Sequence, residues 1–311
     1  MLDSIYQKTI AGLNSKQTLT KLLAQISFRI IKKISSAYDP LIYYPIKGQQ
    51  IKLPLSHALP LVLQYYPDYA NNLARLASCV YAKYPDLKII DIGANIGDSV
   101  FIIRSTVSCP ILCIEGDPVF FGILQKNTAD CENIVTNQVF VGDSDGIASK
   151  DLVIVSGTAH FTDSSNNNTT FRKLSSVLTD EPQFAQAKLL KIDTDGFDVA
   201  IIRGSVDFIQ SVKPVLFFEY DPFFLANQKE DGISIFSILQ TLGYHSIAIY
   251  DNFGRYLISL ALTETSQIAD LHGYLLNRQG DYYYDICAVQ AEDLVIIQQL
   301  REIELSLAKT N

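Results

Sequence analysis

Apolar and polar positions follow two alternating patterns from residue 87 onwards. Short, almost continuous apolar runs predict buried strands at 88–92, 111–115, 137–141, 189–193 and 215–220. Segments with helical spacing between them predict helices at 97–105, 120–131, 199–204 and 233–242. Alternation of this kind is typical of an α/β fold with a doubly wound, mostly parallel, Rossmann-like sheet that is covered on both faces.

The rest of the chain divides into an extension before this core and additions within and after it. Residues 1–84 predict a mainly helical N-terminal extension, with helices within 5–38 and at 69–84 and a short strand at 49–54. Residues 85–311 form the second predicted domain. Later strands are expected at 246–251 and 282–291, a hairpin strand at 151–156, a polar loop at 164–170 and a terminal helix at 293–307.

One helix of the extension is both amphipathic and basic. Residues 19–33 place apolar side chains at helical spacing, with lysines and an arginine elsewhere. Such a helix can lie on a membrane surface or on a partner. We expect it to dock on its own domain, with membrane contact as the less favoured alternative.

A glycine-rich turn follows the first core strand. Asp91 ends this strand, and Gly93, Asn95 and Gly97 follow it. A strand that feeds such a turn brings the backbone close to a nucleotide-like ligand, because glycine lacks a Cβ. The central glycine of the dinucleotide fingerprint is replaced by Asn95, and two acids, Asp91 and Asp98, flank the turn. The turn therefore fits a cationic ligand better than a pyrophosphate.

Glu115 ends the next apolar run, about 20 residues after the turn, where an acid binds ribose hydroxyls. Adenosine joined to a cationic amino-acid tail is S-adenosylmethionine. At this point the chain resembles the FkbM family of S-adenosylmethionine-dependent methyltransferases, through residues 90–98, 113–118, 189–198 and 214–220. The family usually has Val-Glu-Gly in the third block, whereas this chain has Thr194-Asp195-Gly196.

The resemblance implies roles for the cofactor-binding residues. Asp91 and the turn from Gly93 through Asn95 to Gly97 would hold the methionine end of S-adenosylmethionine. Glu115 would accept the ribose hydroxyls. Asp117 would flank the adenosine, and Asp143 would meet the adenine amino group.

The same edge of the sheet supplies candidate catalytic acids. Asp193 and Asp195 follow the fourth strand, and Glu219 lies near the end of the fifth. We expect them to orient an acceptor hydroxyl or remove its proton. A divalent cation on Asp193 and Glu219 is an alternative that we disfavour, since no third ligand is identifiable, so no metal is predicted. The four histidines follow no catalytic pattern and are interpreted as structural.

Composition restricts the function classes. The net charge is −8, which argues against a nucleic-acid partner. Five cysteines without a C-x-x-C pair predict reduced thiols in a cytoplasmic protein, and neither a secretory signal nor a membrane-spanning run is visible.

The expected activity is O-methylation of a sugar, on a polysaccharide or glycolipid precursor, or of a secondary metabolite, as in the family resembled. Three alternatives stay open. Asp193-Thr194-Asp195 is a D-x-D triplet, typical of glycosyltransferases that bind nucleotide sugars. An NAD-dependent oxidoreductase shares the acid after the second strand, and a non-catalytic scaffold would keep only the cofactor turn. The sequence does not reveal the oligomeric state.

Overall fold

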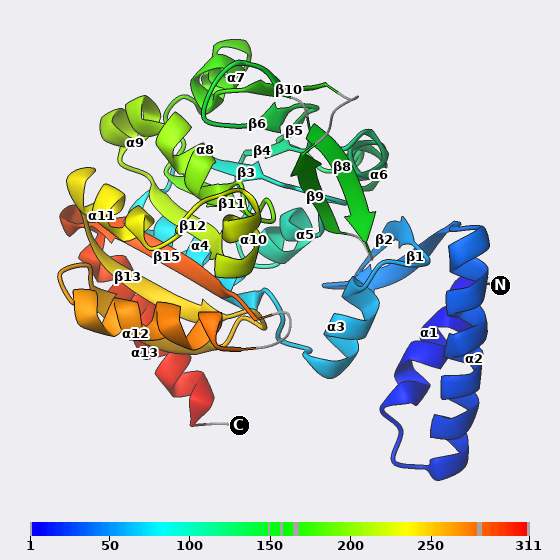
Figure 1. The fold of residues 1–311 in the computed structure, drawn as a ribbon. Coiled ribbons are helices and arrows are strands. Elements are labelled where there is room, and N and C mark those ends of the chain that lie inside the picture. The colour runs from blue at the N-terminus through cyan, green and yellow to red at the C-terminus, as the bar shows by residue number, and fades with distance from the viewer. Residues whose placement is uncertain (1, 149, 156–157, 164–167, 279–281, 310–311) are drawn as a thin grey trace.

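The computed structural model describes residues 2–148, 150–155, 158–163, 168–278 and 282–309. Its centre is an eight-stranded sheet in the order β14-β13-β15-β12-β11-β3-β4-β5 (Figure 1). The strands are β3 (Ile89–Ile92), β4 (Ile111–Ile114), β5 (Ile134–Asn137), β11 (Leu189–Ile192), β12 (Val215–Tyr220), β13 (Tyr244–Asp251), β14 (Tyr256–Ala261) and β15 (Tyr284–Gln290). The neighbours from β12 to β5 pair in parallel, which confirms the predicted doubly wound, mostly parallel α/β sheet.

Alternate strand residues enter two hydrophobic cores, because successive side chains of a strand point to opposite faces. Ile89 and Leu189 belong to one core, and Ile90 and Leu190 to the other, all fully buried. The first core includes residues of α4 (Asn71–Lys83), α5 (Asp98–Arg104), α6 (Pro118–Thr128) and α13 (Leu294–Ala308). The second includes residues of α7 (Leu174–Asp180), α8 (Asp198–Gly204), α9 (Val206–Val212), α10 (Pro222–Asn227), α11 (Ser234–Thr241) and α12 (Thr265–Leu276).

The chain reverses its direction of travel across the sheet between β3 and β11. These strands are parallel neighbours, with Ile89 opposite Leu189. From β3 the chain continues outward to β4 and β5, whereas from β11 it continues to β12 on the other side. Ligands of open α/β sheets bind outside the carboxyl ends of the strands at this point of reversal. The fold therefore places a binding crevice after Ile92 and Ile192.

The N-terminal extension begins with a helical hairpin that stands at one end of the molecule (Figure 1). It consists of α1 (Leu2–Leu13) and α2 (Thr18–Ala37), followed by β1 (Leu41–Ile46), β2 (Gln49–Pro54) and α3 (Leu59–Tyr65). Tyr6 and Ile10 of α1 belong to the same core as the sheet residue Ile89. Within the described residues, no helix is long and apolar enough to cross a membrane.

Some predicted boundaries are wrong. The third parallel strand is 134–137 rather than 137–141, because the β-branched residues of that run lie before the expected start. Residues 140–141 instead form β6 (Phe140–Val141), which pairs with β10 (Thr169–Arg172), and β10 also pairs with β7 (Gly146–Ala148). The prediction missed several peripheral elements, which are β1, β7, β10, β14, α3, α7, α9, α10 and α12.

Other local predictions are confirmed. The expected hairpin strand near 151–156 is β8 (Lys150–Val155), which pairs with β9 (Thr158–Asp163). The strand expected at 282–291 is β15, antiparallel to β12. Of the predicted polar loop at 164–170, residues 164–167 lie outside the described residues. Two short 3₁₀ turns, Pro182–Phe184 and Ala291–Asp293, complete the described elements.

A buried ion pair joins the extension to the end of the chain. In α4, Arg75 Nε lies 2.6 Å from Glu304 Oε1 of α13, and Arg75 Nη2 donates to Glu304 Oε2 at 3.0 Å. The Glu304 side chain is only 5% exposed. We expect Arg75→Ala to lower the free energy of unfolding by about 3–5 kcal/mol in urea denaturation, because it leaves a buried carboxylate unpaired.

The matched control is Arg172→Ala, which removes the exposed ion pair between Arg172 and Asp180. Its expected cost is at most about 1 kcal/mol. Equal losses in the two variants would show that the pair between α4 and α13 does not hold the extension in place.

Candidate active site

The glycine-rich turn after β3 depends on two residues without a Cβ. Gly93 and Gly97 have positive φ angles of 78° and 85°. A Cβ on Gly93 would lie 1.8 Å from the backbone oxygen of Asp193, so the ends of β3 and β11 meet here without room for a side chain. Asn95 has a φ of 48°, a left-handed conformation that asparagine adopts more readily than most residues.

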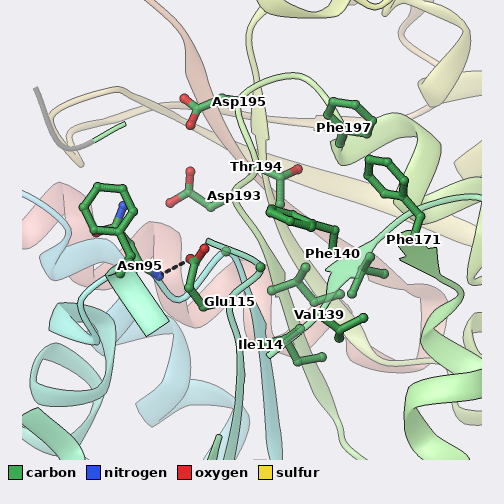
Figure 2. A pocket seen from close by; sticks show the side chains of 15 residues that line it. Asn95, Ile114, Glu115, Val139, Phe140, Phe171, Asp193, Thr194, Asp195 and Phe197 are labelled. Carbon is green, nitrogen blue, oxygen red and sulfur yellow. Dashed lines mark hydrogen bonds between the residues drawn. The ribbon is translucent and has the colours of Figure 1, made fainter. Parts of the chain in front are cut away.

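Glu115 fastens this turn to the end of β4. Its Oε2 accepts a hydrogen bond from the Asn95 backbone N–H at 2.8 Å (Figure 2), and its Oε1 accepts one from the Asp117 N–H at 2.7 Å. Burial raises the pKa of Glu115 to about 7, although both backbone hydrogen bonds oppose the shift. Each carboxyl oxygen keeps a lone pair, so Glu115 can still accept a hydrogen bond from a ligand hydroxyl.

A buried lysine stands between the ends of β3 and β11. Lys191 Nζ lies 2.9 Å from Asp91 Oδ1 and 3.3 Å from Asp193 Oδ2. Asp91 is fully buried, and its other oxygen accepts a hydrogen bond from the Ser99 hydroxyl. Burial would lower the pKa of Lys191, but the attraction of Asp91 and Asp193 prevails and raises it. Lys191 is therefore a permanent cation.

Carboxyl groups gather around the crevice beyond this lysine. The Asp193 side chain is 51% exposed and lines the pocket with Asp195, whereas Glu219 is 4% exposed. Although partial desolvation by the surrounding protein acts to raise the pKa of Asp193, Lys191 and a hydrogen bond with Glu219 lower it. Burial, reinforced by the neighbouring carboxylates, raises the pKa values of Asp195 and Glu219 well above their usual range.

An aromatic wall closes the other side of the pocket (Figure 2). The rings of Phe171 and Phe197 stack with centroids 5.6 Å apart, and Phe140 lies 6.0 Å from Phe171. Gly116 accommodates Phe140, because a Cβ there would lie 2.0 Å from the Phe140 ring. The complete lining is Ile92, Gly93, Asn95, Ile114, Glu115, Gly116, Phe120, Val139, Phe140, Val141, Phe171, Asp193, Thr194, Asp195 and Phe197.

The structure does not bring all the expected cofactor residues into this lining. Asp91 faces Lys191, as described above. Asp117 is buried as the N-cap of α6, where it accepts hydrogen bonds from Val119 and Phe120 N–H at 2.8 Å. Gly97 packs under α6, and Asp143 is exposed beside Gly204. The proposed contacts of Asp117 and Asp143 with adenosine stay predictions.

His57 contributes to the site although its sequence context gave no signal. It lies just before α3, and its Nε2 is 3.4 Å from the side-chain oxygen of Asn95. Its Nδ1 accepts a hydrogen bond from Leu59 N–H at 3.2 Å, so Nε2 carries the proton. Burial lowers the pKa of His57 to about 4, which keeps the ring neutral at pH 7. Only folding brings this residue to the glycine-rich turn, 38 positions away.

Among the described residues, no three His, Cys, Asp or Glu side chains are arranged to hold a metal ion. The pocket does fit an adenosine with a cationic tail. Glu115 offers carboxyl oxygens, the phenylalanines offer an apolar wall, and Asp193 offers negative charge. Within the described part of the chain, the buried Glu219 Oε1 also has no hydrogen-bond partner.

The fold and this pocket define an α/β protein with a nucleoside-type site at its point of chain reversal. The Methyltransferase FkbM domain matches residues 91–246, half of the chain, and the chain therefore belongs to the FkbM methyltransferase family. This confirms the expected family and enzyme class, with S-adenosylmethionine as the cofactor. Comparison with curated protein sequences gives no match.

Solved structures show distant likenesses. An FkbM methyltransferase from Methylobacillus flagellatus KT is 17% identical, with 72% of this chain and 56% of that chain covered and a TM-score of 0.35. Precorrin-6y C5,15-methyltransferase from Geobacter metallireducens GS-15 is 11% identical, with 70% and 87% covered and a TM-score of 0.39. The N-terminal domain of human METTL16 is 13% identical, with 78% and 76% covered and a TM-score of 0.40.

The close approach at Gly93 gives a direct test of the turn. We expect Gly93→Ala to lower the free energy of unfolding by about 2–5 kcal/mol and to abolish S-adenosylmethionine binding in calorimetric titration, because the methyl group must displace Asp193 and strain the backbone. The control is Gly122→Ala in α6, where a Cβ meets nothing within 4 Å. It should raise stability by about 0.5–1 kcal/mol and leave binding intact. Retained binding in Gly93→Ala would contradict the tight contact.

Burial of Glu115 predicts a pH dependence of stability. Its pKa is raised from 4.5 to about 7 on folding, so the folded state binds the proton more tightly than the unfolded chain. Stability from this group is complete below pH 4.5 and falls by about 3 kcal/mol as the pH rises to 7.

Urea unfolding from pH 4.5 to pH 7.5 should show this decline, and Glu115→Gln should reduce it, because glutamine keeps the shape of the protonated acid without titrating. Asp198 and Asp285, whose pKa values burial also raises to about 7, contribute in the same direction in both proteins. The difference between the pH dependences of stability of the two proteins therefore isolates the contribution of Glu115. Equal pH dependences would refute the raised pKa of Glu115.

Proposed function

We propose that this protein is an O-methyltransferase whose acceptor is a neutral hydroxyl, on a sugar of a polysaccharide or glycolipid precursor or on a secondary metabolite. The observation that carries the proposal is the group of carboxyls at the pocket, Asp193, Asp195 and Glu219, beside the cofactor-binding turn. A hydroxyl must lose its proton when it accepts a methyl group, and carboxylates can hold and remove that proton.

The charge of the site supports a neutral acceptor. Lys191 is the cation next to Asp193, whereas burial and neighbouring carboxylates raise the pKa values of Asp195, Asp198 and Glu219. An acceptor that carries a phosphate or carboxylate would be repelled by the ionised Asp193, and the described lining of the pocket contains no lysine or arginine to pair with it. A nucleotide sugar on Asp193-Thr194-Asp195 would need a divalent cation to bridge its phosphates, and the absence of a three-ligand metal site among the described residues disfavours it.

In this proposal Asp193 lies between the cofactor and the acceptor and interacts with both, whereas other residues hold the rest of the cofactor. Bound S-adenosylmethionine supplies the methyl group on a sulfonium, whose positive charge suits the carboxylate of Asp193. We assign the ribose hydroxyls to Glu115 and the adenosine to the aromatic wall around Phe140. The carboxylate of Asp193, which Lys191 keeps ionised, holds the acceptor hydroxyl.

Proton removal falls to Asp195 in this proposal. Its raised pKa makes it a stronger base than an ordinary aspartate. Glu219, whose pKa burial and the neighbouring carboxylates raise, shares a hydrogen bond with Asp193 and fixes its orientation. All five cysteines lie in the described residues and are free, which supports a reaction in the reducing cytoplasm.

Cofactor binding is tested first, by calorimetric titration of the protein with S-adenosylmethionine. We expect Glu115→Ala to lose binding, because it removes the carboxyl that we assign to the ribose. Among the described residues, Glu115 is the only buried carboxyl in the lining of the pocket. Glu132→Ala, at an exposed position, should bind like the wild type. Binding that survives Glu115→Ala would refute the assigned role.

The catalytic assignment is tested with S-adenosylmethionine carrying a tritiated methyl group and a panel of sugars and amines. We expect label on sugar hydroxyls, and Asp195→Asn should lower kcat by about 10²–10⁴-fold without changing cofactor affinity. Asp207→Asn, on the exposed surface of α9, is the matched control. Label on amines alone would contradict O-methylation. Cofactor binding without transfer to any acceptor would favour the scaffold alternative.

A further inference from the structure

The second helix of the N-terminal hairpin exposes its apolar side chains. Ala24 and Ile31 are the residues of α2 that are buried. The exposed large apolar side chains lie between 43% and 69% accessible and are Leu19, Leu22, Leu23, Ile26, Ile30 and Ile34. We call these six residues the α2 stripe. As expected from the sequence, α2 packs on its own domain. It does so through Ala24 and Ile31, whereas the six large apolar side chains of the α2 stripe remain exposed.

The α2 stripe is continuous along the helix. Apart from the adjacent Leu22 and Leu23, successive members are three or four residues apart, so all six share one face of about 120° at about 100° per residue. Ala24 and Ile31, which pack inward, lie on the opposite side. Ile5 of α1, 49% exposed, adds to the exposed apolar surface of the hairpin. A contiguous exposed patch of this kind usually marks a contact with a partner or a membrane.

The hairpin is basic in a protein that is otherwise acidic. Residues 4–38 contain six basic side chains and no acidic one, whereas the remaining residues carry 19 basic and 33 acidic side chains. The basic residues are Lys8, Lys16, Lys21, Arg29, Lys32 and Lys33. Four of them, Lys21, Arg29, Lys32 and Lys33, belong to α2 and are exposed. At about 100° per residue, Lys33 lies within the α2 stripe and Arg29 at its edge, whereas Lys21 and Lys32 lie on the other side of the helix.

We propose that the α1–α2 hairpin binds the surface of an anionic lipid bilayer, with the α2 stripe among the acyl chains and the lysines and Arg29 against the lipid phosphates. An exposed apolar face on a basic helix is the pattern of helices that lie in the membrane interface. Clustered lysines and arginines add electrostatic attraction to anionic lipids. Four charges within 20 residues fit a helix on the surface and not across the bilayer.

A second copy of the chain fits this surface less well. Pairing of two α2 stripes about a two-fold axis would bring two sets of six positive charges together, and residues 4–38 offer no carboxylate to either. Like charges that face each other across an interface oppose association. Lipid phosphates supply the missing negative charge.

Sedimentation of the full chain with vesicles tests the proposal independently of methyl transfer. We expect binding to vesicles of phosphatidylglycerol and phosphatidylcholine in equal parts, at least tenfold weaker binding to phosphatidylcholine alone, and release by high salt. Leu22→Ser/Ile26→Ser should abolish binding, and Lys32→Gln/Lys33→Gln should weaken it about tenfold or more. These side chains are exposed, so the variants should remain folded.

Matched controls change the same residue types elsewhere. Leu276→Ser, at a 59% exposed position on α12, and Lys126→Gln/Lys309→Gln, both exposed, should bind vesicles like the wild type. Absence of binding to the anionic vesicles, or equal binding by Leu22→Ser/Ile26→Ser, would overturn the proposal. So would a wild-type dimer in light scattering that Leu22→Ser/Ile26→Ser converts to a monomer, because the stripe would then be covered by a second copy.

Discussion

One buried ammonium group holds the cofactor edge of the sheet together. Lys191 of β11 contacts Asp91 of the neighbouring β3 and Asp193 beyond its own strand, while it is only 6% exposed. Without it, Asp91 would be a fully buried carboxylate beside other acids, which costs several kcal/mol. The ion pair also fixes the spacing of the two strand ends. At this spacing the backbone of Gly93 lies against the backbone of Asp193, with no room for a Cβ.

The single cation does not neutralise the acids around it, and this imbalance gives the pocket its chemical character. Burial raises the pKa of Asp98 to about 6 and that of Asp198 to about 7. Neighbouring carboxylates act to raise both pKa values further. Several of these groups are therefore protonated or close to titration at pH 7. A cationic ligand would stabilise their ionised forms, so its binding and their ionisation favour each other.

The sequence predicts the sheet better than it predicts side-chain roles. Apolar runs identify the central strands, because strands covered on both faces have no alternative to continuous apolar residues. The segment 252–280 lacks this pattern, so β14 and α12 were missed. Spacing also placed Asp91 and Glu115 at one edge, but it could not show that Asp91 faces Lys191 while Glu115 faces the pocket. That difference, and the position of His57 next to Asn95, arise from tertiary packing.

The chain separates a basic N-terminal hairpin from an acidic remainder, and this separation affects more than the pocket. A net charge of −8 opposes general attraction to an anionic surface, so only a local basic region can bind there. The hairpin provides that region at one end of the molecule (Figure 1), whereas all 33 acidic residues lie outside residues 4–38 of the sequence. The resulting field would orient the chain with its hairpin toward lipid and its acidic body away. Such an orientation requires no further contact, because attraction at one end and repulsion elsewhere act together.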